Sequence, residues 1–211
     1  MEVSTSLLSV KKEDIIQTIY NLEVAHTDYF HIDVMDGRFV ENDTSETMRI
    51  YCEYLNQVTN VPIDVHLMVT NVKEYIDSYS IFNPNIITFH YEACKDDTEV
   101  DKYIEQIKGR ECKVGLAIKP NTEIDKILKF LPKINLLLIM SVEPGKGGQK
   151  FIDFIPFIQD CKYVGCSHIY ESEKECGVKR AVLDGKISKS RYENFVKIYK
   201  ELEENYKRRY N

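Results

Sequence analysis

The feature that most constrains the fold is a regular alternation of short apolar runs with longer amphipathic segments. The apolar runs are rich in β-branched and bulky residues and have the length of β-strands. They are Val3–Ser9, Tyr29–Val34, Pro62–Met68, Ile86–His90, Lys113–Ile118 and Leu136–Ser141. Several are apolar almost throughout, which is typical of strands that are buried on both faces of a parallel sheet.

The segments between these runs carry apolar residues at helical spacing, as Ile15, Ile19 and Leu22 do within Lys12–Ala25. The other predicted helices are Glu46–Thr59, Val72–Ser80, Thr98–Arg110, Glu123–Leu131 and a charged C-terminal helix, Ser190–Asn211. A strand followed by a helix, repeated about every 25 to 30 residues, predicts βαβ units with right-handed crossovers. Such units build either an open doubly wound sheet or a closed barrel.

Two observations favour an α/β barrel of the TIM (β/α)8 type. No GxGxxG motif follows the first predicted strand, which weakens the case for a dinucleotide-binding sheet. Polar residues instead follow several different strands, as a barrel active site requires. With 211 residues and no visible linker, we expect one barrel domain over residues 1–211, divergent from about residue 153 onward.

Composition narrows the partners and the compartment. The net charge of −6 argues against a nucleic-acid partner, which usually requires a basic face. No apolar run is long enough to span a membrane, and the N-terminus lacks the basic start of a signal peptide, so we expect a cytoplasmic protein. Six cysteines without a CxxC pair are interpreted as reduced, mostly buried thiols.

Two neighbouring strands end in residues that suit a metal ion. His31 and Asp33 share one face of the second strand, because alternate residues of a strand point the same way, and Met35 follows them. On the third strand, His66 and Met68 share a face in the same manner. Imidazole and carboxylate groups bind zinc, iron, manganese or cobalt, so the pattern predicts one divalent metal ion.

The sixth strand runs into a glycine-rich segment that contains Gly145, Gly147 and Gly148. Such a turn exposes backbone N–H groups that hold phosphate, and barrels often bind phosphate on their late loops. Lys146 lies within this turn and either reaches the phosphate or points into water. Glycines also occur in tight turns that bind nothing. The prediction of a phosphate site therefore depends on the position of this turn after a late strand.

Five ordered segments give the chain a specific resemblance. HIDVMDGRFV, PIDVHLMV, ITFHYEA, VGLAIKPNT and LLLIMSVEPGKGGQKFI resemble the ribulose-phosphate 3-epimerase family, over roughly residues 3 to 152. The resemblance implies a (β/α)8 barrel and an isomerase of the pentose phosphate pathway. Such an enzyme interconverts D-ribulose 5-phosphate and D-xylulose 5-phosphate by metal-assisted proton transfer at C3, through an enediolate.

The resemblance also implies a role for each site residue. His31, Asp33 and His66 would be metal ligands, and Asp33 would be one of two acid/base carboxylates. Ser6 would touch the substrate, the three glycines would lie near its phosphate, and a sulfur-lined wall would come from Met35, Met68 and Met140. Inversion at C3 needs a second carboxylate on the opposite face of the substrate.

That second carboxylate falls where the chain departs from the family pattern. We assign it to Asp184, as catalytic residue and metal ligand, on a predicted seventh strand that runs through Ala181–Ile187. In the competing alignment Gly177–Ser188 is the eighth strand, the seventh lies near Lys162–His168, and its aspartate is missing. The 27 residues after Asp184 cannot hold a helix, an eighth strand with a phosphate loop and a last helix, so in either alignment about one strand–helix unit is lost or reshaped.

Three functions stay open on the sequence alone. The first is the pentose-phosphate 3-epimerase, and the second is an epimerase for a related ketohexose phosphate such as allulose 6-phosphate. The third is a degenerate paralogue that binds metal or sugar phosphate without turnover. The expected partner is a small sugar phosphate, with no nucleic acid or membrane, and a homo-oligomer is possible by resemblance.

Overall fold

The computed structural model describes residues 2–145, 155–163, 165–189, 192–193, 195–197 and 199–200. The chain divides into two compact units, which are described separately. The first unit comprises residues 1–119 and 129–148, and the second comprises residues 120–128 and 149–211. The break at residue 148 lies close to the predicted point of divergence. The expectation of a single domain stays a prediction, because two compact units can belong to one domain.

The first unit alternates strands and helices as the sequence predicts. Its strands are β1 (Ser4–Ser6), β2 (Tyr29–Met35), β3 (Ile63–Met68), β4 (Ile86–His90), β5 (Lys113–Ile118) and β6 (Leu136–Ile139). Its α-helices are α1 (Ile15–Val24), α2 (Ser45–Val58), α3 (Val72–Ser80) and α4 (Asp97–Lys108). Short 3-10 turns, η1 (Lys12–Asp14) and η2 (Tyr91–Ala93), precede α1 and follow β4.

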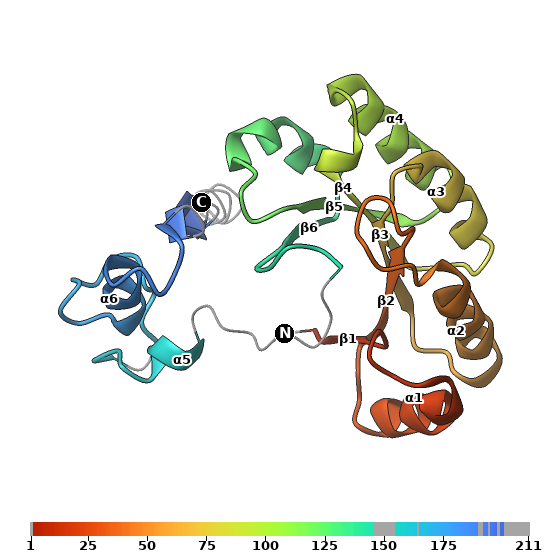
Figure 1. Cartoon of the computed structure of the whole chain (residues 1–211), viewed down its shortest axis with the longest axis horizontal. Coiled ribbons are helices and arrows are strands. Elements are labelled where there is room, and N and C mark those ends of the chain that lie inside the picture. The colour runs from red at the N-terminus through yellow and green to blue at the C-terminus, as the bar shows by residue number, and fades with distance from the viewer. Residues whose placement is uncertain are drawn as a thin grey trace, which may run out of the picture. The chain divides into compact units, whose positions relative to one another are not determined.

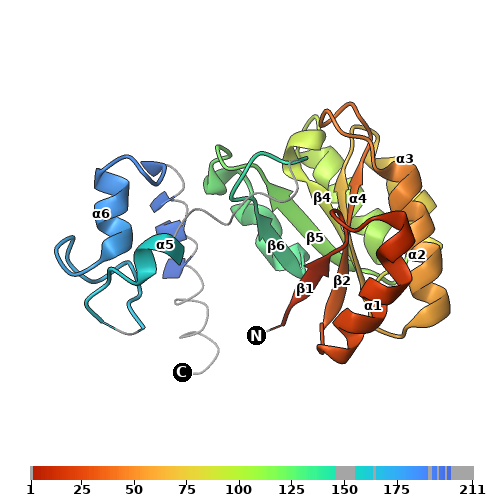
Figure 2. The ribbon, with the colours of Figure 1, turned by 60° about the horizontal axis from the view of Figure 1, so that its bottom comes forward.

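The six strands form one parallel sheet in the order β1-β2-β3-β4-β5-β6. Each strand lies beside the next one along the chain, the order in which a (β/α) barrel is built. The sheet curls, and α1 to α4 pack along its convex face (Figures 1 and 2). The first unit is therefore a curled half-barrel, and the predicted TIM-type α/β fold is confirmed.

The main core lies between the sheet and these helices. On β2 the side chains of Phe30, Ile32 and Val34 are fully buried. Apolar residues of the helices, such as Ile19 of α1 and Met48 of α2, are buried as well. The alternate residues of β2 therefore face the concave side, and this alternation places His31 and Asp33 there.

The prediction of an α-helix at residues 123–131 is wrong. The structure has two 3-10 segments, η3 (Ile124–Lys126) and η4 (Leu128–Lys133). Pro132 lies inside η4. Proline has no N–H to donate and disfavours a helical conformation in the residue before it, so a continuous α-helix is interrupted here.

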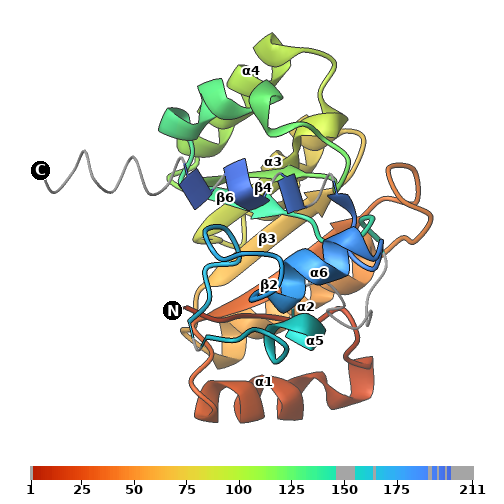
Figure 3. The same cartoon turned by 90° about the vertical axis from the view of Figure 1, so that its left-hand side faces the viewer.

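In the second unit, the structure contains α5 (Ile155–Ile158) and α6 (Gly177–Leu183), which lie side by side (Figure 3). Residues 181–183 belong to α6, so the predicted seventh strand is wrong, and so is the eighth strand of the competing alignment. No described residue of 162–168 is in a strand. In α6 the apolar Val178, Ala181 and Val182 have helical spacing, which the prediction of a strand overlooked.

The described residues between 192 and 200 are helical, in agreement with the predicted C-terminal helix. The remainder of that predicted helix lies outside the described residues. Nowhere in the described part of the chain is a helix both long enough and apolar enough to cross a bilayer.

Candidate active site

The register of β2 against β3 brings the predicted metal ligands together. Asp33 lies directly opposite His66, and Met35 lies opposite Met68. Ser6 of β1 pairs with His31 on the other side. Within the described residues, one ligand-type atom each from His31, Asp33 and His66 all lie within 4.8 Å of one another. The three side chains therefore meet at one point, as the sequence predicts.

Asp33 is the centre of this cluster. Its Oδ1 lies 3.2 Å from Nε2 of His31 and 3.1 Å from Nδ1 of His66. The hydroxyl of Ser6 donates a 2.7 Å hydrogen bond to its Oδ2. About an eighth of the Asp33 side chain is exposed, at 12%, so a small molecule can reach the carboxylate from the concave side of the sheet.

Each histidine is held by a further group behind it. Nδ1 of His31 lies 2.7 Å from Oδ2 of Asp64, which also accepts a hydrogen bond from Ser4. Nε2 of His66 lies 3.0 Å from Nε2 of His90. These contacts fix the orientation of both rings, as second-sphere groups do for metal-binding histidines.

The chain of contacts through His90 also fixes a tautomer. Nδ1 of His90 lies 3.1 Å from Oε2 of Glu92, whose other oxygen accepts the backbone N–H of Lys119. A carboxylate only accepts, so His90 donates from Nδ1 and its Nε2 becomes an acceptor. We therefore assign the proton of neutral His66 to Nε2, which leaves the lone pair of Nδ1 pointing at Asp33.

The pKa shifts agree with this arrangement. Burial opposes protonation of His31, but hydrogen bonds and charge from Asp33 and Asp64 outweigh it and raise the pKa of His31 to about 10. Burial also works against ionised Asp33, yet His31 and His66 hold the pKa of that carboxyl well below its usual range. Complete burial lowers the pKa of His66 to about 4, with the neighbouring His90 and His31 acting in the same direction.

The donor set fits a divalent metal ion. With the assigned tautomer, a lone pair of His66 and a carboxylate oxygen of Asp33 face each other at 3.1 Å. Two acceptors at that distance repel unless a cation or a proton lies beside both. Two imidazole nitrogens and a carboxylate oxygen form a donor set that zinc, iron, manganese and cobalt accept, with positions left for substrate.

The methionines of the predicted sulfur wall are placed separately. Met35 and Met68 are each 1% exposed and lie opposite each other, one residue pair beyond Asp33 and His66 on the β2–β3 ladder. Met140 follows β6 and is half-buried, and its backbone N–H pairs with Ile118 of β5. Met35 and Met68 thus form a buried apolar edge beside the cluster.

The loop after β6 packs against the loop after β2. Gly145 has φ +88°, and a Cβ on it would lie 2.7 Å from Cβ of Val40, so only glycine fits this approach. Its carbonyl accepts a 2.7 Å hydrogen bond from Asn42. A hollow of about 250 Å³ lies here, lined by residues of three loops: Phe39, Val40, Glu41, Asn42, Lys119, Glu143, Pro144 and Gly145. Gly147 and Gly148, together with Lys146, lie outside the described residues.

Comparison with known sequences decides the family. Residues 2–196 match the profile of the ribulose-phosphate 3 epimerase family. The chain belongs to the ribulose-phosphate 3-epimerase family.

Three curated relatives carry the family name. Ribulose-phosphate 3-epimerase 1 of Cupriavidus necator is 36% identical over 120 residues, which are 57% of this chain and 48% of the relative. The Bacillus subtilis enzyme is 35% identical over 57% of this chain and 53% of its own length. The Buchnera aphidicola enzyme is 39% identical over 56% of this chain and 51% of its own length. The chain thus spans about half the length of the curated relatives it matches.

Asp184 does not lie at the end of a strand, contrary to the prediction. It follows α6 and ends that helix, where its backbone N–H pairs with the carbonyl of Arg180. Its side chain is 57% exposed and forms an ion pair of 3.3 Å with Lys186. The predicted seventh strand, on which its assignment as second carboxylate and metal ligand was based, is replaced by a helix, and the role itself stays a prediction.

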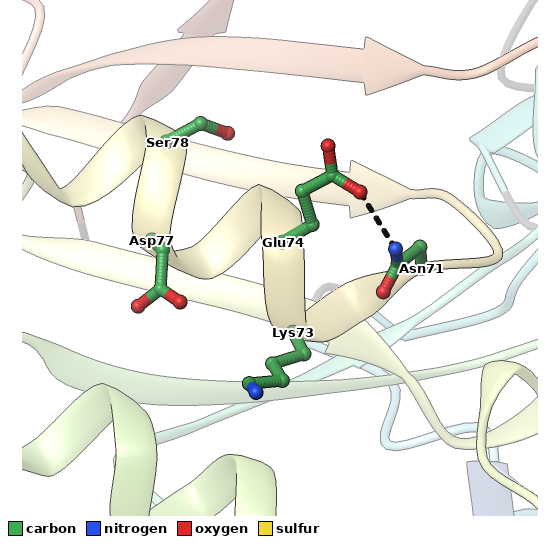
Figure 4. Close-up of a pocket in the computed structure, with 5 residues that line it drawn as sticks. All are labelled: Asn71, Lys73, Glu74, Asp77 and Ser78. Carbon is green, nitrogen blue, oxygen red and sulfur yellow. Dashed lines mark hydrogen bonds between the residues drawn. The ribbon is translucent and has the colours of Figure 1, made fainter.

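A second hollow in the first unit lies on the outer side of α3 (Figure 4). It is lined by Asn71, Lys73, Glu74, Asp77 and Ser78. Asn71 donates a hydrogen bond to Glu74, and Arg110 pairs with Asp77 across to the end of α4. Both carboxylates of this hollow are thus already paired, and we infer no site there.

The residues behind the site were not predicted as part of it. Asp64 lies two residues before His66 on the same face of β3, His90 ends β4, and Glu92 lies in the turn that follows. The sequence contains a partial signal in each case. Asp64-x-His66 and His90-x-Glu92 each bring a carboxylate near a strand-end histidine, although Asp64 contacts His31 of the neighbouring strand rather than His66.

Proposed function

We propose that this chain acts as a ribulose-phosphate 3-epimerase that moves the C3 proton of a pentose 5-phosphate. The observation that carries the proposal is the convergence of His31, Asp33 and His66 on the concave face of a family half-barrel. A proton next to a ketone is weakly acidic, so its removal needs both a base and a stabiliser of negative charge. This cluster offers both.

Each residue of the site has its own role in the proposed reaction. Asp33 is ionised at neutral pH, because the two histidines keep its pKa low, and it is therefore available to remove the proton at C3. Ser6 holds its Oδ2 and reaches the open side of the cluster. Met35 and Met68 keep water away from one border of the site. A divalent ion held by His31, Asp33 and His66 would polarise the ketone and stabilise the negative charge of the enediolate.

The arrangement of the second sphere supports the metal part of the proposal. Asp64 accepts from one histidine, and the His90–Glu92 pair accepts from the other. Both ligand nitrogens then present lone pairs to the same point as the Asp33 carboxylate. The donor set does not choose among zinc, iron, manganese and cobalt. A pentose phosphate pathway role, a cytoplasmic location and a homo-oligomer stay predictions from the sequence.

A second candidate function has an observation in its favour. The residue predicted to be the second carboxylate, Asp184, lies at the exposed end of a helix and pairs with Lys186. A site with one carboxylate would bind metal and sugar phosphate, and would remove a proton from one face only. Such a chain would be the metal-binding, non-epimerising paralogue that the sequence leaves open.

Turnover distinguishes the two candidates. The purified chain, loaded in turn with Zn²⁺, Mn²⁺, Fe²⁺ or Co²⁺, is supplied with D-ribulose 5-phosphate, and D-xylulose 5-phosphate is measured. Epimerisation in the native chain that disappears in Asp33→Asn supports the proposal. Metal bound at the histidines, with no product under any loading, contradicts it and favours the second candidate. D-allulose 6-phosphate, supplied in parallel, tests the hexose alternative.

A further inference from the structure

The second unit contains another cluster of ligand-type side chains, separate from the site in the first unit. Cys161, Cys166, His168 and Cys176 each offer one sulfur or nitrogen atom, and these four atoms lie within 4.8 Å of one another. All three thiols are free, so no disulfide accounts for their proximity. We propose that these four side chains form a structural zinc site, here called the Cys3His cluster.

The measured distances match a tetrahedral zinc ion. Zinc–sulfur bonds of about 2.3 Å and zinc–nitrogen bonds of about 2.0–2.1 Å, at tetrahedral angles, separate a sulfur from a nitrogen ligand by about 3.6 Å. Nδ1 of His168 lies 3.6 Å from Sγ of Cys161 and 3.5 Å from Sγ of Cys176. The side chains therefore already have the spacing of zinc ligands.

Backbone amides point at two of the sulfur atoms. The N–H of Gly177 donates to Sγ of Cys161 at 3.3 Å, and the N–H of Lys179 donates to Sγ of Cys176 at 3.4 Å. A thiol sulfur is a weak acceptor, whereas a thiolate is the form that binds metal. Amide donors aimed at sulfur stabilise that anionic form.

A glycine allows the two halves of the cluster to approach. A Cβ on Gly177 would lie 2.1 Å from the carbonyl oxygen of Phe157, so no other residue fits without a shift of the backbone. This contact brings the end of α5, which precedes Cys161, against the start of α6, which follows Cys176. The two terminal cysteines of the cluster are thus held together by a close backbone contact.

The loop between these cysteines is bent by two residues with left-handed backbone conformations. Gly165 has φ +80° and His168 has φ +61°. For a histidine this conformation is uncommon, and it persists where surrounding contacts enforce it. The hydroxyl of Tyr192 donates a 2.7 Å hydrogen bond to the carbonyl of His168, and Lys179 ties the carbonyls of Ile169 and Glu171 to α6. The bends turn Cys166 and His168 toward the other ligands.

The apolar core around the cluster is small. It consists of four buried residues, Cys176, Val178, Ala181 and Ile187, with partly buried side chains such as Phe157 packed against it. Small units whose core is too limited to fold alone are commonly stabilised by a metal ion or by disulfides. Because the thiols are free, a metal ion is the remaining stabiliser of this kind.

The donor set identifies the ion and its role. Three thiolates and one imidazole within reach of a single point suit Zn²⁺, and they rule against Mg²⁺ or Ca²⁺, which prefer oxygen ligands. Four protein ligands complete a tetrahedral shell and leave no position for substrate, which is the pattern of structural zinc. The sequence signature is C-x4-C-x-H-x7-C, between residues 161 and 176.

Cobalt spectroscopy on the full chain tests the proposal. The protein is stripped of metal under reducing conditions and titrated with Co²⁺, which replaces Zn²⁺ in such sites. We expect a near-ultraviolet sulfur-to-cobalt charge-transfer band that saturates at a single equivalent and disappears when Zn²⁺ is added. His31, Asp33 and His66 contain no sulfur, so cobalt at the first site does not produce this band, and the result is independent of epimerase activity.

Matched variants show which residues bind the cobalt that produces the band. Cys166→Ser and His168→Asn should abolish it or weaken it severely, and asparagine tolerates the left-handed backbone of residue 168. Cys112→Ala, which removes a buried thiol of the first unit, should leave it unchanged, as should His31→Ala. The proposal is overturned if the native chain gives no such band, if the band survives in both ligand variants, or if the freshly purified protein carries a disulfide among these cysteines.

Discussion

The two clusters of ligand-type side chains differ in the number, the kind and the surroundings of their donors. In the first unit, two imidazoles and one carboxylate meet on the concave face of a sheet, with Ser6 on their open side. In the second unit, three sulfurs and one imidazole are collected between two short helices. A set of three with an open side is suited to chemistry on a substrate, whereas a complete set of four is suited to holding a fold together.

The surroundings of the two clusters also indicate a catalytic role for the first and a structural role for the second. His31 and His66 are oriented by carboxylates and a further histidine, contacts that set proton positions. The sulfurs of Cys161 and Cys176 are instead approached by backbone amides, contacts that set chain geometry. Loss of metal should therefore affect activity in one unit and folding in the other.

The largest expected effect is the loss of the fold of the second unit when its metal is removed. Structural zinc contributes an apparent 10–16 kcal/mol, about as much as the whole stability of an ordinary domain. We expect His168→Asn, or chelation under reducing conditions, to expose residues 155–200 to proteases. Limited proteolysis followed by mass spectrometry measures this. Cys112→Ala serves as the control, and equal protection of the native and His168→Asn chains would contradict the comparison.

Next in size is the effect of Asp33→Asn on catalysis. Loss of a positioned general base usually lowers a rate by about 10²–10⁴-fold, and this variant also removes a metal ligand. We expect kcat/KM for ribulose 5-phosphate to fall at least that far while the circular dichroism spectrum is unchanged. Asp77→Asn on the outer side of α3 is the matched control and should stay within about twofold, as expected for exposed ion pairs.

A smaller effect should follow from the group behind His90. Glu92→Gln replaces an acceptor of the His90 proton by an amide that can present a donor, so the tautomers of His90 and His66 are no longer fixed. Second-sphere changes of this kind cost about 10–100-fold in metal affinity. Calorimetric titration with Mn²⁺ measures it. Glu74→Gln, on the surface of α3, should bind Mn²⁺ as tightly as the native chain. An unaltered affinity in Glu92→Gln would contradict a role of the His90–Glu92 contact in orienting His66.

The mildest effect is a dependence of metal affinity on pH. The pKa of His31 is raised to about 10, so the metal-free chain carries a proton there at pH 7, and that proton must leave when metal binds. The pKa of His66 is lowered to about 4, so that ring is already neutral. We expect about one proton released per metal, and an affinity that rises about tenfold per pH unit between roughly pH 6 and pH 8.

Titration in buffers of different ionisation enthalpy counts these protons. Asp64→Asn removes one of the groups that raise the pKa of His31 and should reduce the number released. A pH-independent affinity, or the release of two protons, would contradict the assigned protonation states of the first site.

The first unit was largely predictable from sequence because its signals are local and repeated. Most of its strands lie in runs rich in apolar residues, and strand alternation alone places His31 and Asp33 on one face. A parallel sheet built in chain order makes β2 and β3 neighbours, and their observed register then sets Asp33 opposite His66. What alternation cannot show is that His90 and Asp64 complete the site, since that depends on contacts between strands.

The second unit was predicted wrongly for the opposite reason. The motif around Asp184 resembles a strand end of the family, but Val178, Ala181 and Val182 pack as a helix against Phe157. The three cysteines of the Cys3His cluster were interpreted as isolated buried thiols, because no CxxC pair marks them. Their convergence depends on the bends at Gly165 and His168, which a spacing rule does not contain.

The central claim is that Asp33 removes the C3 proton of a sugar phosphate bound in the first unit. Solvent exchange tests it most directly, because exchange at C3 needs one carboxylate only, whatever supplies the second. The metal-loaded chain is incubated with ribulose 5-phosphate in D₂O, and deuterium at C3 is followed by mass spectrometry. The account predicts incorporation in the native chain and none above background in Asp33→Asn. No incorporation by the native chain with any of the four metals, or equal incorporation by both chains, would contradict it.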